Sequence, residues 1–144
     1  MNDLKSWESL YEKYSSLFEY RKDRSVPLKY GIECDIGWYD ILSSLCFLIA
    51  QHENNNEWSN KHRIKENREP IPYKSVKFIQ IKQKFGGLRV YFDGGNDYIS
   101  GLVHMAEGWS YKACEKCGEK GILRKNNGYG IQVLCEKCNS EIRS

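Results

Sequence analysis

Apolar residues recur every three or four positions in three stretches of the chain, a spacing that predicts three amphipathic helices. The first runs from Asp3 to Tyr20. The second follows Gly37, with Asp35 as its candidate N-cap, and is expected to end at His52. The third begins near Asp97 and reaches the first cysteine pair. The aromatic side chains of the first helix are expected to belong to the core, because aromatics at helical spacing usually face inward.

Between the second and third helices, the apolar spacing changes to every second position. Alternation over residues 75–85 and 88–93, separated by Gly86 and Gly87, predicts a β-hairpin with the two glycines in its turn. A second hairpin is predicted over residues 121–134, with Asn127-Gly128 at its turn. Helices packed on small antiparallel hairpins place the chain in the α+β class.

Residues 53–72 interrupt this pattern with a polar, asparagine-rich segment that closes with two prolines. We interpret it as a polar excursion outside the core, and connectors of this length are uncommon in compact domains unless they are mobile or functional. Trp58 lies here beside Lys61 and Arg63, and these three residues form a candidate surface for a phosphate backbone or an acidic partner. A solvated insertion without a binding role is the alternative.

The formal charge of +3 on 144 residues is unevenly distributed along the chain. Residues 57–90 contain nine Lys and Arg against three Asp and Glu, whereas residues 1–56 contain six against nine. The basic segment includes one face of the first hairpin, which carries Lys82, Lys84 and Arg89. With the amides of Gly86 and Gly87, these side chains are candidates for binding an anion or a partner, and a tight turn without a ligand is the alternative.

Four cysteines near the C-terminus form two C-x2-C pairs, Cys114 with Cys117 and Cys135 with Cys138, separated by seventeen residues. Such pairs converge on one metal ion, and two pairs complete a tetrahedral sulfur shell that leaves no open position for water. We therefore predict one structural Zn²⁺ in a treble-clef or ribbon-like finger. Iron in a rubredoxin-like site and disulfides are the alternatives.

The finger is expected to occupy residues 112–144 and to pack on an α+β domain formed by residues 1–111. The N-terminus lacks the apolar core of a signal peptide, and no stretch reaches membrane-spanning length. These features predict a cytoplasmic protein with reduced thiols and no membrane partner. Cys34 and Cys46 are expected to be structural, and His104 with Glu107 to be an ordinary helical pair, so we favour a protein that is not an enzyme.

One combination of motifs resembles a known group of proteins. Gly37-Trp38-Tyr39, the run from Gln80 to Tyr91 that contains Lys-Phe-Gly-Gly-Leu-Arg, and the C-terminal cysteine array are similar to small, largely uncharacterised proteins encoded by phages and prophages. The resemblance covers the chain from about Gly31 to its C-terminus. It implies an origin in a phage and a place in the host cell cytoplasm.

Three functions are compatible with these features. The first is a phage accessory protein that binds a host macromolecule, most simply a host protein such as a component of antiviral defence. The second is a regulatory protein that binds nucleic acid through the basic segment. The third is a sponge for an anion or nucleotide at the Gly-Gly turn, which would show as stabilisation by a small ligand.

Overall fold

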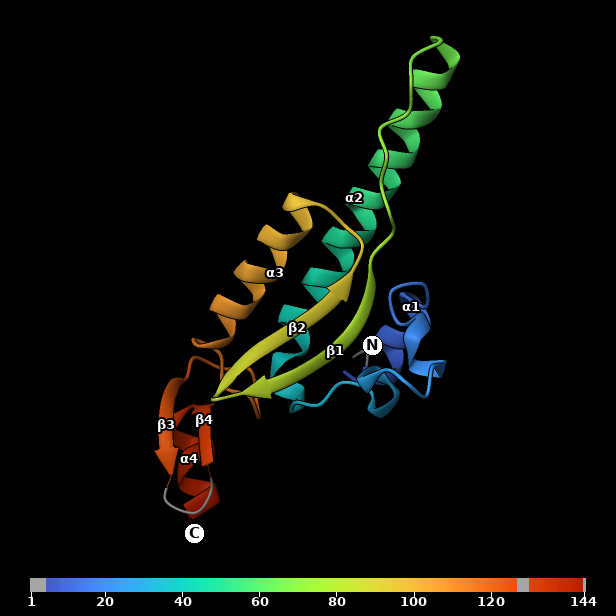
Figure 1. The fold of residues 1–144 in the computed structure, drawn as a ribbon. Coiled ribbons are helices and arrows are strands. Elements are labelled where there is room, and N and C mark those ends of the chain that lie inside the picture. Colours follow the sequence, from blue (N-terminus) through green and yellow to red (C-terminus); the bar gives the residue numbers. More distant parts are fainter. Residues whose placement is uncertain (1–4, 127–129, 144) are drawn as a thin grey trace.

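The computed structural model describes residues 5–126 and 130–143, and it has the predicted α+β architecture with two two-stranded antiparallel sheets (Figure 1). The helices and strands are α1 (Trp7–Lys13), α2 (Tyr39–Lys65), β1 (Lys77–Lys84), β2 (Gly87–Asp93), α3 (Asp97–Ser110), β3 (Ile122–Asn126), β4 (Gly130–Leu134) and α4 (Glu136–Arg143). Three 3-10 turns, at Glu19–Lys22, Pro27–Tyr30 and Ile36–Trp38, lie between α1 and α2. Among the described residues, no helix is both long and apolar enough to cross a membrane.

The main core lies between the β1–β2 hairpin and the helices α2 and α3; in Figure 1, α2 runs behind the hairpin and α3 lies beside β2. Apolar side chains from every layer are completely buried there, including Trp38, Phe78, Ile81, Leu88 and Ile99. The apolar residues that follow α1 complete the core from the side of β1. The spacing of apolar residues in the sequence thus predicts which faces of α2 and α3 are buried.

Both outer edges of the hairpin are covered, although the sheet has only two strands. Along β1, the amide of Phe78 donates to the carbonyl of Leu17 (2.9 Å), and the amide of Glu33 donates to the carbonyl of Ile81 (2.9 Å). Unpaired strand edges invite pairing with other chains. The N-terminal segment therefore shields this edge of the hairpin.

The edge of β2 is covered by side chains of α3. The amide of Leu88 donates to the hydroxyl of Ser110 (2.9 Å), and the amide of Val90 donates to the carboxylate of Glu107 (3.0 Å). Ser110 is fully buried and in turn donates to the carbonyl of Glu107 (2.6 Å). With both edges satisfied and the inner face in the core, the outer face is the side of the hairpin that stays partly open to solvent, with Lys84 and Tyr91 exposed and Lys82 and Arg89 half-buried.

The first predicted helix is too long at its C-terminal end. Helix α1 begins after Ser6, whose hydroxyl accepts a hydrogen bond from the amide of Ser9 (3.2 Å), and it ends at Lys13. Two serines follow Tyr14, and serine competes with helical hydrogen bonding through its own hydroxyl. Leu17 is nevertheless buried, in the turn after the helix. Residues 1–4, where the predicted helix starts, lie outside the described residues.

The largest correction concerns residues 53–72, a polar excursion that we predicted to begin where the second helix ends. Helix α2 does not end at His52 but continues to Lys65, and the chain then returns in an extended conformation to Val76. No glycine or proline interrupts the sequence between Gly37 and Pro70, so the helix can propagate. It ends where Asn67 adopts a left-handed conformation (φ 58°) and the amide of Arg68 donates to the carbonyl of Arg63 (2.8 Å).

Residues 54–72 form an arm that extends beyond the rest of the molecule (Figure 1), and none of its side chains is buried. Polar contacts hold the two sides of the arm together. The side-chain amide of Asn60 donates to the carbonyl of Ile71 (3.0 Å) and accepts from the backbone amide of Ile71 (2.8 Å). The side chain of Arg63 donates to the carbonyl of Glu69 (2.6 Å). The arm is thus an excursion outside the core, as predicted, but a helical one.

The turn of the first hairpin is shifted by one residue from its predicted position. Lys84 pairs with Gly87, so the two turn residues are Phe85 (φ 52°) and Gly86 (φ 90°). A Cβ at Gly87 would lie 2.3 Å from the ring of Tyr111, which explains why this position, inside the strand, is a glycine. The predicted Asn127-Gly128 turn of the second hairpin lies outside the described residues.

Candidate metal centre and hairpin face

The four cysteines of the C-terminal array come together, with all four sulfur atoms within 4.8 Å of one another. The Sγ atoms of Cys117 and Cys135 are 3.7 Å apart. In a tetrahedral site with metal–sulfur bonds of about 2.3 Å, neighbouring sulfurs lie about 3.8 Å apart. The array therefore has the dimensions to hold one metal ion through four thiolates.

The local backbone prepares the array for a metal. Gly118 follows the first cysteine pair with φ 87°, and its amide donates to the carbonyl of Cys114 (2.8 Å). In the second pair, the amide of Cys138 donates to the Sγ of Cys135 (3.3 Å), and this hydrogen bond lowers the pKa of Cys135 to about 7. The lowered pKa eases formation of the thiolate, which is the form that binds metal, at Cys135.

The cysteines form part of a small separate core, to which β3, β4 and α4 contribute few apolar side chains. Cys114, Leu134 and Cys138 are buried, and Ile142 packs against them. Cys117 lies at the surface. The order of elements, with a cysteine pair, a hairpin and a second cysteine pair that opens a helix, is that of the treble-clef finger among the predicted types.

The first cysteine pair is fixed to the main core through the turn that precedes α2. The amide of Gly37 donates to the carbonyl of Glu115 (2.7 Å), and the indole of Trp38 donates to the carbonyl of Ala113 (2.9 Å). A Cβ on Gly37 would lie 2.2 Å from the carbonyl oxygen of Cys114. The first cysteine pair and the start of α2 thus share a backbone-to-backbone contact that only glycine permits.

Glu115, which lies between the two cysteines of the first pair, is only 3 % exposed. Its carboxylate accepts hydrogen bonds from the amide of Asp35 (3.0 Å) and from the side chains of Gln83 (3.5 Å) and Gln132 (3.4 Å). Burial raises the pKa of Glu115. The side chain links the turn before α2 with β1 and β4, a role that its sequence position alone did not indicate.

The predicted basic residues of the hairpin share its outer face. The register places Lys82 directly opposite Arg89, and Lys84 follows two residues later towards the tip. Arg89 donates to the hydroxyl of Tyr111 (3.0 Å), a contact that raises the pKa of its guanidinium. Phe85, at the tip, is 71 % exposed. The structure therefore brings together three cations and an exposed aromatic ring.

The two glycines of the predicted anion site are buried. A Cβ at Gly86 would lie 2.4 Å from the side chain of Leu123, and one at Gly87 would meet Tyr111. Gln83 also donates to the carbonyl of Ile131 (2.8 Å). These contacts give the glycines a packing role, in which they let the hairpin tip rest on the finger.

The predicted residues of the arm lie far from this face, at the opposite end of the molecule from the finger (Figure 1). Trp58 is 63 % exposed and its ring lies 4.0 Å from that of His62. Lys61 forms an exposed ion pair with Glu57 (3.6 Å), and Arg63 is bound to the arm's own backbone. Trp58, Lys61 and Arg63 therefore belong to a separate surface from the hairpin residues.

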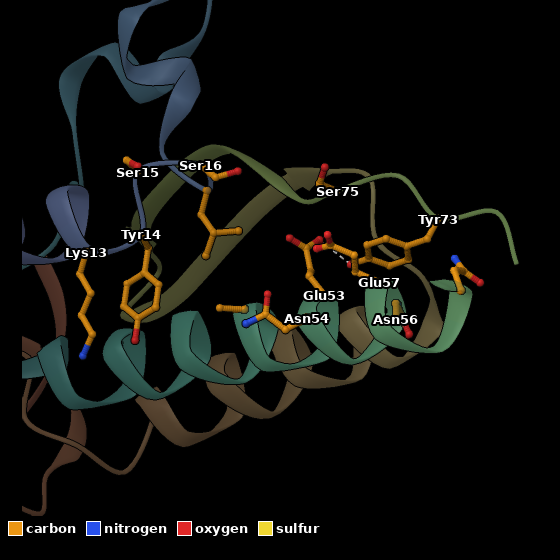
Figure 2. Close-up of a pocket in the computed structure, with 13 residues that line it drawn as sticks. Lys13, Tyr14, Ser15, Ser16, Glu53, Asn54, Asn56, Glu57, Tyr73 and Ser75 are labelled. Atoms are coloured by element: carbon orange, nitrogen blue, oxygen red, sulfur yellow. Dashed lines mark hydrogen bonds between the residues drawn. The ribbon is translucent and has the colours of Figure 1, made fainter. Parts of the chain in front are cut away.

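A groove of about 470 Å³ at the base of the arm was not predicted from the sequence (Figure 2). Helix α2, the segment after α1 and the returning chain form its walls, and Tyr73 donates to Glu53 across it (2.6 Å). Most of its lining is polar, including Asn54, Asn56 and Glu57. These side chains share a groove only because α2 continues past His52, where we expected it to end.

The remaining thiols and the predicted helical pair have structural surroundings. Burial raises the pKa of Cys34 and of Cys46, which disfavours the reactive thiolate at both positions. Glu107 accepts the amide of Val90 at the edge of β2, while His104 is exposed on the same helix. None of these groups is arranged as a nucleophile with its base.

No protein-family model, curated protein or solved structure matches the chain. Its function must therefore be inferred from the geometry of these residues.

Proposed function

We propose that the chain is a non-enzymatic, phage-type accessory protein that binds a host macromolecule through the outer face of its β1–β2 hairpin. The observation that carries this proposal is the gathering of Lys82, Lys84 and Arg89 beside Phe85 on a two-stranded sheet with covered edges. Exposed aromatic and arginine side chains on a rigid support are typical of binding surfaces.

The partner that suits this face best is a host protein with an acidic surface, such as a component of antiviral defence. Three cations on one face favour fast association with negative charge, and the exposed ring of Phe85 supplies an apolar anchor. Because the tip of the hairpin rests on the finger, this anchor is held in place before the partner arrives. Preorganisation of this kind reduces the entropy lost on binding.

The binding test is the double charge reversal Lys82→Glu with Lys84→Glu, compared with Lys120→Glu and Lys125→Glu, which make the same change in net charge on exposed lysines of the finger. We expect the hairpin variant to lose at least about tenfold in affinity for a partner captured from host lysate, because charged side chains mainly affect binding by the surface on which they lie. The finger variant should bind normally. Equal binding by both variants would contradict the proposal.

We further propose that the metal is one structural Zn²⁺. Four thiolates fill a tetrahedral shell and leave no position for water or substrate, so the ion stabilises the finger and has no catalytic role. Protein purified without added metal should contain one zinc per chain by elemental analysis. A rubredoxin-like iron site would instead give iron and strong visible absorption, and that result would replace zinc in the proposal.

Nucleic acid is the second candidate partner, because the same three cations can neutralise phosphates. If three phosphate contacts form, affinity for duplex DNA should fall roughly fortyfold between 50 and 200 mM salt. Absence of binding to DNA and RNA at low salt would exclude this candidate and leave the host protein. Loss of nucleic-acid binding in the Lys82→Glu, Lys84→Glu variant, with capture of a protein partner intact, would favour the nucleic acid instead.

A further inference from the structure

Helix α2 carries a continuous exposed seam on the side that faces away from the core. Starting at Asp40 and advancing by four and three residues in turn, every position reached is exposed. The eight residues of this seam are Asp40, Ser44, Phe47, Gln51, Asn54, Trp58, Lys61 and Lys65. Alternating steps of four and three keep side chains on one face of a helix, as in the contact seam of a coiled coil.

The seam includes two large aromatic side chains that are more than half exposed, although the ring of His62 lies beside that of Trp58 and Lys13 and Tyr14 flank Phe47. Phe47 is 53 % exposed and Trp58 is 63 % exposed, and they lie three helical turns apart on the same face. The buried residues of α2, such as Leu42 and Ile49, point to the opposite side. The second half of the helix lies in the arm, which has no buried side chain at all.

An arm of this kind gains little stability from its own contacts. Most helical stability in proteins comes from packing of an apolar face, and a helix segment held by polar contacts alone is marginal in water. In the arm, these contacts include the paired hydrogen bonds of Asn60, the Arg63 contact with Glu69 and the exposed ion pairs Lys61–Glu57 and Arg68–Glu66. Exposed ion pairs contribute little, so a surface that covers the seam would stabilise the arm.

The positions of the seam form four pairs about its midpoint, which falls between residues 52 and 53. Three of these pairs carry complementary side chains, an acid with a base, an aromatic with an aromatic, and an amide with an amide. They are Asp40 with Lys65, Phe47 with Trp58, and Gln51 with Asn54, and the fourth pair is Ser44 with Lys61. When two copies of a helix pack antiparallel about a twofold axis, such positions meet across the interface.

We propose that this seam is a homodimer interface, in which α2 packs antiparallel against α2 of a second copy of the chain. Phe47 packs on the partner subunit's Trp58, and Trp58 packs on the partner subunit's Phe47. Asp40 meets the partner subunit's Lys65 at each end, and the amides of Gln51 and Asn54 hydrogen-bond around the axis. The twofold axis makes every contact occur twice, which is the defining property of an isologous interface.

Charge complementarity favours a second copy of the chain over an unrelated partner at this seam. The seam carries its acid near one end of the helix and its bases near the other, so an antiparallel copy places unlike charges together and a parallel copy places like charges together. Asp40 already contacts Lys5 of its own chain (3.1 Å), and both side chains remain more than half exposed. The carboxylate of Asp40 can therefore also contact a second cation, Lys65 of the partner subunit.

The dimer is independent of the proposed binding role of the hairpin. The buried residues of α2 face the core that lies between this helix and the hairpin, and the seam lies on the other side of the helix, away from the hairpin. A dimer would therefore leave the outer face of the hairpin open in both subunits. Failure of the dimer would not affect binding by the hairpin, and failure of hairpin binding would not affect the dimer.

The first test measures the mass of the full, metal-loaded chain by sedimentation equilibrium across a wide range of protein concentration. We expect a reversible monomer–dimer equilibrium in which Trp58→Ala and Phe47→Ala each raise the Kd at least about tenfold, since each removes two aromatic contacts. Met105→Ala, which truncates another exposed apolar residue on α3, should leave the Kd unchanged. A monomer at every concentration, or a dimer insensitive to Phe47 and Trp58, would overturn the proposal.

The second test uses the symmetry directly. Asp40→Lys alone places lysine opposite lysine in its own dimer, and Lys65→Asp alone places aspartate opposite aspartate, so each variant should dimerise several-fold more weakly. An equimolar mixture restores two unlike pairs and should form a heterodimer as tight as the original dimer. Lys5→Ala, which removes the intrachain partner of Asp40, serves as the control and should not weaken the dimer. Failure of the mixture to recover would contradict the antiparallel arrangement.

Discussion

Replacing Cys138 by serine is expected to remove the metal and unfold the C-terminal finger, the largest effect among the substitutions considered. Apparent binding energies of structural zinc in small fingers are about 10–16 kcal/mol, and this energy is also folding energy. The finger has little else to stabilise it, because its own core consists of Cys114, Leu134 and Cys138 with Ile142 beside them. Elemental analysis should find no bound metal, and hydrogen exchange should show loss of protection over residues 112–143.

The matched control for this substitution is Cys34→Ser, which changes a partly buried thiol outside the array. It should retain one metal ion and a protected finger. Chelation of the metal from the unmodified protein should reproduce the Cys138→Ser result, and readdition of zinc should reverse it. A Cys138→Ser protein with full metal content and unchanged thermal stability would show that the array is not a metal site.

Gly37→Ala is expected to have the second largest effect, a loss of about 3 kcal/mol in the free energy of unfolding, at the upper end of typical overpacking costs. The added Cβ would lie 2.2 Å from the carbonyl oxygen of Cys114 and 2.3 Å from that of Glu115. Both obstructing atoms belong to the backbone, so no change of rotamer relieves the contact. The finger must move away from the start of α2, and the hydrogen bond from the amide of Gly37 to Glu115 is lost with it.

A suitable control is Gly101→Ala in the middle of α3, where an added Cβ meets nothing within 4 Å. Alanine is favoured over glycine in a helix by roughly 0.5–1 kcal/mol, so this variant should be slightly more stable than the original. Urea unfolding of the two variants measures both effects on the same scale. Similar stability of the two proteins would mean that the turn before α2 does not restrain the cysteine pair.

The elements defined by local sequence patterns were the ones that could be predicted. The alternation from residue 75 to 93 identified the first hairpin, and the spacing of apolar residues identified α3 and its start near Asp97. Asn96 caps this helix, since its side chain accepts a hydrogen bond from the amide of Ile99 (3.2 Å). Each of these features depends on residues close together in the chain, where period and turn chemistry are informative.

The arm could not be predicted in the same way, because its helix has no buried face. Prediction from apolar spacing ended α2 at His52, where the buried positions end, while the absence of glycine and proline up to Pro70 allowed the helix to continue. The hairpin turn was displaced for a different reason. Gly86 and Gly87 looked equivalent in the sequence, but only Gly87 faces the ring of Tyr111, a residue distant in the chain.

The residues of the candidate site also divide into those that local sequence patterns predicted and those whose roles depend on contacts between distant residues. The spacing of the four cysteines predicted which residues converge, and the alternation of the hairpin predicted that Lys82, Lys84 and Arg89 share a face. The attachment of the finger was not visible, because Gly37 and Glu115 lie far apart in sequence and their roles depend on direct contact. A buried glutamate between two cysteines has no distinguishing sequence pattern.

The end of the arm has a practical and evolutionary consequence. The chain reverses direction there, around Asn67, in a segment whose side chains are all exposed. Exposed reversals of this kind tolerate inserted residues, because lengthening them disturbs no core. Relatives of this protein are therefore expected to differ in length at this point, and a fluorescent or affinity module inserted between Asn67 and Glu69 should leave the metal centre and the hairpin face intact.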